Sequence, residues 1–175
     1  MIGALEIIVG VLYFTNKIFL AINKSGAWYV GICASLCAVV YFYMLGSLVL
    51  VGLEVAFVFI QVLGLAFEKE QTINPKYLYG SILGLIGLLF YLVHNSTWLE
   101  FVCSSVFIIG VYLMVIKIRK IAWLLFMFGH SLMAYFTYTK GQYVFMTLQI
   151  LSVGVAIYAL LRIYNAEKVK PLSVK

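Results

Sequence analysis

Four polar side chains lie deep inside long apolar segments: Glu54, Gln61, His130 and Gln149. Polar groups in hydrocarbon are costly, and they usually face a cavity or a partner. Glu54 is the clearest case, because an unpaired carboxylate there is expensive, and Gln61 follows two helical turns later on nearly the same face. Such groups could hold a polar small molecule by hydrogen bonds, and Glu54 could balance a positive charge on it.

Aromatic side chains accompany these polar groups. Trp28, Trp123, Tyr41 and Tyr135 offer flat faces on which a planar ligand could stack, and a cationic ring would gain about 0.5–2 kcal/mol from each. The expected substrate-binding set is therefore Glu54, Gln61, His130, Gln149, Trp123, Trp28, Tyr41 and Tyr135. The alternatives are tryptophans that anchor helix ends at the membrane interface, tyrosines that face lipid, and a histidine that only joins two helices.

Catalytic chemistry has little support in the chain. It has two histidines and contains no HExxH, GxSxG, P-loop or dinucleotide fingerprint, so we expect no enzyme and no cofactor or metal. The three cysteines, Cys33, Cys37 and Cys103, all lie in apolar segments. An odd number at membrane depth argues against a disulfide framework, and packing is the expected role.

The composition requires lipid as the solvent. The 175 residues are 65% hydrophobic and 10% charged, with a mean hydropathy of +1.10. A soluble domain has about 25% charged residues, so this chain could not cover its own surface in water. We expect one integral membrane unit whose first segment is a retained helix. The net charge of +6 reflects orientation in the bilayer, and nucleic acid is not an expected partner.

The apolar segments predict an all-α membrane protein with seven transmembrane helices. A span needs about 20 mostly apolar residues. The predicted spans cover residues 4–22, 28–45, 47–67, 77–94, 99–116, 121–138 and 143–163. The run from Val30 to Phe67 is about twice the length of one span, so it requires a tight hairpin at Gly46. The turn at 139–142 is its clearer counterpart.

Basic residues fix the expected orientation. With the N-terminus outside, eleven of the twelve lysines and arginines fall at inner helix ends, inner loops or the tail, and only Lys140 lies outside. This bias agrees with the positive-inside rule. We expect a plasma-membrane protein, in a bacterial inner membrane, with a cytoplasmic C-terminus.

An internal repeat organises the chain. Glu6, Trp28, Gly46 and Glu54 return as Glu100, Trp123, Gly141 and Gln149, with spacings of 22, 18 and 8 residues and then 23, 18 and 8. The offset of four helices gives two parallel three-helix repeats joined by a linker helix. The expected units are residues 1–67, the linker 68–96, residues 97–163 and a tail at 164–175. Facing half-units of this kind commonly enclose a solute pathway.

These residues resemble a known family. The residues that carry the resemblance are Glu6, Trp28, Gly31, Ser35, Tyr41, Leu48, Glu54, Phe57, Trp98, Glu100, Leu113, Lys117, Trp123, Gly141, Tyr143, Leu148 and Gln149. Together they are similar to the PnuC-type vitamin transporters over nearly the whole chain. That resemblance implies a SWEET-like order of three, one and three helices and facilitated, uncoupled uptake of an unphosphorylated vitamin or nucleoside such as nicotinamide riboside. It also implies a homotrimer.

The chain departs from the family pattern in places. Glu54 stands where the family tends to have glutamine, and His130 stands where asparagine or aspartate is expected. Two alternatives stay open. SWEET and PQ-loop sugar carriers share the helix order, although the chain has no Pro-Gln pair. A non-transporting membrane interaction subunit is the other, but a scaffold would not need Glu54 and Gln149 at matched sites.

Overall fold

The computed structural model describes residues 2–24, 26–68 and 97–169, together with ten residues between 80 and 94. The continuous ranges form six helices. These are α1 (Ile2–Ile22), α2 (Ala27–Met44), α3 (Leu48–Phe67), α5 (Trp98–Val115), α6 (Arg119–Thr139) and α7 (Tyr143–Val169). Short turns join α1 to α2, α2 to α3, α5 to α6 and α6 to α7, and the linker separates α3 from α5. Apart from the end of α7, every boundary lies within two residues of its predicted position. No strand occurs within these described ranges.

All six helices are long and apolar enough to cross a bilayer. Mean hydropathies of 1.3 to 2.3 over their spans leave few charges to be solvated, so lipid is the natural environment of the bundle. The prediction of an all-helical membrane protein is confirmed at this level. Part of the predicted linker helix, residues 77–94, lies outside the described residues.

Helix α7 is longer than the sequence predicted. It continues six residues past 163, to Val169, through a segment that we had assigned to the tail. Lys120 of α6 donates to Glu167 at 3.2 Å, and this exposed ion pair holds the extension beside the start of α6. Hydropathy alone ends the helix too early, because a helix need not stop where its apolar residues stop.

Tight turns join the helices inside each group of three. Gly46 and Gly141 have φ values of +72° and +69°, which glycine adopts without steric cost. Behind these glycines, Ser47 N–H donates to Phe42 O at 3.0 Å and Gln142 N–H donates to Thr137 O at 2.9 Å. Both are 6→1 bonds of the Schellman type, which end a helix and reverse the chain. The hairpin predicted at Gly46 is confirmed.

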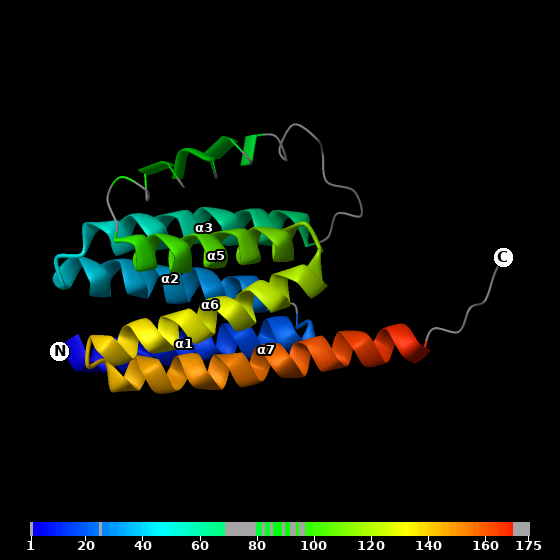
Figure 1. The fold of residues 1–175 in the computed structure, drawn as a ribbon. Helices are drawn as coiled ribbons and strands as arrows, with labels where there is room; N and C mark the ends of the chain where they lie inside the picture. Colours follow the sequence, from blue (N-terminus) through cyan, green and yellow to red (C-terminus); the bar gives the residue numbers. More distant parts are fainter. Residues whose placement is uncertain are drawn as a thin grey trace.

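The six helices form a closed ring. The helices whose backbones lie side by side are α1–α2, α2–α3, α3–α5, α5–α6, α6–α7 and α7–α1, and no other pair of these six helices has neighbouring backbones. Helices α1, α3, α5 and α7 run in one direction, and α2 and α6 run back (Figure 1). The ring therefore has two ends. The basic end, where α1, α3, α5 and α7 finish, carries Lys24, Lys117, Arg119, Lys120 and Lys168.

Described residues of the linker lie outside this ring. Ser81 and Tyr112 of α5 form a hydroxyl–hydroxyl hydrogen bond of 3.1 Å, and the Tyr91 ring lies against Gly52 of α3. In Figure 1 this green stretch runs along α3 and α5. It covers the seam between these helices, and its Leu88 packs against the main apolar cluster.

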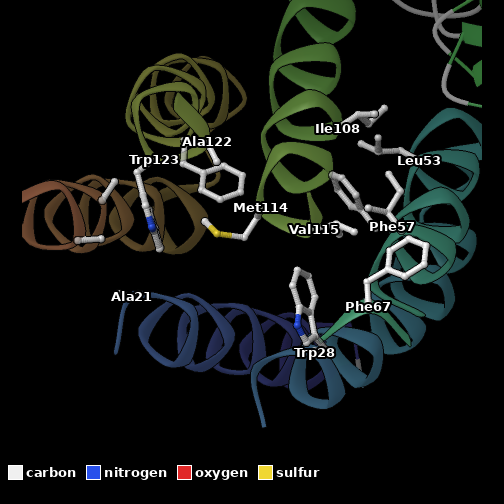
Figure 2. Close-up of a cluster of buried hydrophobic side chains, with 14 residues drawn as sticks. Ala21, Trp28, Leu53, Phe57, Phe67, Ile108, Met114, Val115, Ala122 and Trp123 are labelled. Carbon is white, nitrogen blue, oxygen red and sulfur yellow. The ribbon is translucent and has the colours of Figure 1, made fainter. Parts of the chain in front are cut away.

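The main apolar cluster fills the ring toward its basic end. Trp28 extends from α2 toward Met114 and Val115 of α5, as Figure 2 shows. Trp123, on the other side, packs edge-on against Phe126 with ring centroids 5.4 Å apart. Both tryptophans are buried, at 8% and 2% exposure, so neither is an interface anchor.

Candidate functional site

A cavity of about 180 Å³ occupies the middle of the ring. All six helices contribute to its wall, and most of the lining is apolar or aromatic. Its polar members are Tyr13, Asn16, Lys17, Glu54, Gln61, Glu100, Ser104, Thr137, His130, Gln142 and Gln149. An apolar chamber with a few convergent polar groups is the usual form of a small-molecule site.

One polar cluster joins α1, α2 and α3. The Tyr13 hydroxyl donates to the Glu54 carboxylate, and it also lies 2.9 Å from the Ser35 hydroxyl. Gln61 donates from Nε2 to the same serine oxygen at 3.1 Å. A chain of hydrogen bonds thus runs from Gln61 through Ser35 and Tyr13 to Glu54. It satisfies one carboxylate oxygen, as a charge buried to 5% exposure requires.

The Gln61 side chain is only partly satisfied. Its Oε1 is buried and has no hydrogen-bond partner. It lies over Gly31 of α2, where a methyl group would collide with Oε1 and would approach Asn16 Nδ2 to 2.8 Å. Asn16 Nδ2 donates to Ala27 O at 2.7 Å and is therefore already engaged. Gly31 makes room for an amide oxygen that could accept a hydrogen bond from a ligand.

A second polar pair on the cavity wall joins the neighbouring helices α6 and α7. His130 Nδ1 and Gln149 Oε1 are 2.6 Å apart. Because an amide oxygen only accepts, Nδ1 is the donor of this hydrogen bond. The Phe107 ring of α5 packs on the imidazole with centroids 4.7 Å apart. His130 is 4% exposed, so the pair is held in one orientation by its surroundings.

Lys17 brings a positive charge to the same chamber. Its Nζ donates to Ser152 Oγ of α7 at 2.9 Å, and Ser152 in turn donates to Leu148 O at 2.6 Å. From the sequence we assigned Lys17 to an inner helix end. Its amino group instead reaches a serine nine residues inside α7, about 14 Å from the start of that helix.

The structure brings together five of the eight residues predicted for the site. Glu54, Gln61, His130, Gln149 and Trp28 line the cavity. The other three lie elsewhere. Trp123 belongs to the apolar cluster, Tyr41 is buried against Phe145 with centroids 5.9 Å apart, and Tyr135 is 61% exposed on the outer surface.

Tyr13, Lys17 and Ser104 line the cavity but were missing from the predicted set. A usable signal existed for the first two, because Val9, Tyr13, Asn16, Lys17 and Leu20 follow the i, i+4, i+7 spacing of one helix face. Ser104 gave no such signal. Among the described residues, no group of three or more histidine, cysteine or acidic side chains could hold a metal ion.

A smaller cavity of about 70 Å³ opens at the basic end. Lys24, Lys117 and Arg119 are part of its lining. Leu20 and Trp28 line both cavities, so these two side chains stand between them. The Trp28 ring lies against Gly64 of α3, where an added methyl group would come within 2.6 Å of the ring.

No protein-family model, curated protein or solved structure matches this chain. The fold and the site define a helical membrane protein with at least six apolar helices and a central chamber that contains polar and charged groups.

Proposed function

We propose that the protein is a membrane transporter for facilitated uptake of a vitamin or nucleoside-type small molecule. The observation that carries the proposal is the central cavity, to which all six ring helices contribute and which contains Glu54, Gln61, His130 and Gln149. A helix scaffold has no reason to hold buried polar groups around an internal space. A pathway does, because a polar solute must exchange its water for protein groups.

Two parallel three-helix units are the second element of the proposal. The repeat pairs α1 with α5, α2 with α6 and α3 with α7. When each helix is replaced by its counterpart, the list of neighbouring helices stays the same. Ser35 and Glu54 then correspond to His130 and Gln149, so each unit offers a polar group from its middle helix and one from its third. Rocking of one unit against the other would expose this site to either side.

The barrier between the two cavities supports this mechanism. Trp28 is large, lines both spaces and rests on the bare backbone of Gly64. A rotation of α2 relative to α3 would move the ring off that surface and join the cavities. The basic end would then be the cytoplasmic exit, in accord with the positive-inside rule. In this proposal the protein lies in the plasma membrane, a bacterial inner membrane, with its N-terminus outside. It works as a homotrimer of PnuC-like subunits.

A binding experiment on purified protein tests the proposal. A variant with Trp28 as its only tryptophan, made by Trp98→Phe and Trp123→Phe, is titrated with nicotinamide riboside, thiamine, riboflavin, deoxynucleosides and sugars. We expect a vitamin or nucleoside to quench the Trp28 fluorescence in a saturable way. The same ligand should not quench it in Glu54→Gln. Quenching by a sugar alone would support a SWEET-like sugar carrier. No quenching by any ligand, in protein that remains folded, would favour a non-transporting subunit.

A further inference from the structure

We propose that Lys17 is an anion-binding subsite of the central cavity, and that the molecule bound there carries a carboxylate group. The inference rests on the proposed function in one respect, because it takes the cavity to be a ligand site. The inference goes further by naming the chemical class of the ligand.

The position of the Lys17 ammonium carries the inference. Side chains on a helix lean toward its N-terminus, so Lys17 leans away from the nearby basic end and toward the middle of the bundle. Its hydrogen bond to Ser152 fixes it at that depth. A lysine that only extended to the interface would point the other way.

No carboxylate of the described residues lies within 4.0 Å of Lys17, and Glu54 acts on it electrostatically from beyond that distance. Among the described residues, the only ion pair within 4.0 Å joins Lys120 and Glu167 at the surface. Glu54 lines the same cavity, but its hydrogen-bonded oxygen is engaged by Tyr13. The single hydrogen bond of Lys17 goes to a neutral hydroxyl, which leaves two of its three N–H groups available. An ammonium at this depth is costly without an anion.

The packing of α1 against α7 does not require the Lys17 ammonium. Arg162 of α7 already donates from Nη1 to Ala21 O at the end of α1, at 2.8 Å. The counterpart of Lys17 in the second unit is Val111, on the seam between α5 and α3, and that seam is apolar. The equivalent contact between α5 and α3 is therefore packed without a lysine.

The surroundings of Lys17 indicate what the carboxylate is attached to. Phe107, Phe126 and Trp28 line the same cavity and offer apolar and aromatic contact. The unpartnered Oε1 of Gln61 is an acceptor for an N–H or O–H group. The chamber holds an amine, Lys17, and a carboxyl group, Glu54, so a ligand that carries a carboxylate together with a cationic or N–H group on an aromatic or apolar body complements both.

Benzoate and benzamide provide a matched test, because they share a ring and differ in the carboxylate. Binding of each to the purified protein in neutral detergent is followed by Trp28 fluorescence, with Trp98→Phe and Trp123→Phe present in the wild type and in every variant compared. We expect the wild type to bind benzoate about tenfold more tightly than benzamide, the size of a charge-assisted hydrogen bond. Lys17→Met should bring the two affinities together, and Lys17→Arg should keep the preference. The control Lys24→Met removes a lysine that does not line this cavity and should change nothing.

Two results would overturn the subsite. One is a wild type without preference for benzoate, including the case in which neither compound binds. The other is a preference that survives Lys17→Met. If Lys17→Met fails to fold, the comparison of Lys17→Arg and Lys17→Gln replaces it, and only the arginine should keep the preference. Benzoate preference in a protein that moves no solute would refute the transport function and keep the subsite, so the two failures are distinguishable.

Discussion

The Tyr13 hydroxyl on α1 donates a hydrogen bond to the Glu54 carboxylate on α3. The backbones of these helices are not neighbours, because α2 lies between them in the ring. The bond therefore reaches across the interior of the first three-helix group and fixes the buried carboxylate at the edge of the central cavity. It explains how this cluster can keep an acidic group among apolar side chains.

Loss of that hydroxyl should weaken both the fold and the site. In Tyr13→Phe the carboxylate loses its donor while it stays buried, which costs about 1.5–3 kcal/mol of stability for a bond to a charged group. We expect a lower thermal unfolding temperature of the detergent-solubilised protein and weaker binding of any cavity ligand. Tyr135→Phe is the control, because Tyr135 is 61% exposed on the outer surface. Equal behaviour of the two variants would show that the Tyr13 bond contributes nothing.

Gly64 should not tolerate even a methyl group. Its Cβ would come within 2.6 Å of the buried Trp28 ring, so the ring would have to leave its place on α3. We expect Gly64→Ala to destabilise the protein by about 1–3 kcal/mol, as overpacking does. Gly154→Ala on α7 is the matched control, since no atom lies within 4 Å of its added methyl group. In thermal unfolding, Gly154→Ala should match or exceed the wild type. An unchanged Gly64→Ala would mean that Trp28 does not rest on α3.

The orientation can be tested by cysteine labelling in intact cells. In a variant without Cys33, Cys37 and Cys103, we expect a membrane-impermeant thiol reagent to modify Lys140→Cys. Lys24→Cys, at the basic end, should react only after the cells are opened. The physical reason for this expectation is the positive-inside rule, by which an end rich in lysine and arginine favours the cytoplasmic side. The reverse pattern would invert the orientation.

Apart from the end of α7, the sequence was sufficient to predict the six described helices and the turns at Gly46 and Gly141, because their signals are local. Apolar runs, the charged breaks between them and the glycines at positions 46 and 141 lie in the chain itself, and each became a boundary or a left-handed turn. Glu54 and Gln149 were equally visible, because a polar group stands out in an apolar segment.

Side-chain direction was harder to predict. In a helix that is apolar on every side, periodicity does not indicate which face is inside. Tyr41 and Tyr135 were therefore placed in the pathway, although one packs beside Phe145 and the other lies on the surface. Lys17 was missed for a different reason. A lysine five residues from a helix end is ordinarily drawn to the interface, and only the fold reveals Ser152 opposite it.

Uptake into proteoliposomes tests the central claim most directly. The reconstituted protein is supplied with nicotinamide riboside, thiamine, riboflavin, deoxynucleosides, nicotinate and pantothenate, with Tyr135→Phe as a control for folding and insertion. The account predicts that at least one of these solutes equilibrates across the membrane, and that Glu54→Gln, at the cavity wall, alters its rate or selectivity while Tyr135→Phe does not. Folded protein that moves none of them, or uptake that is indifferent to Glu54, would contradict the claim that the cavity is a solute pathway.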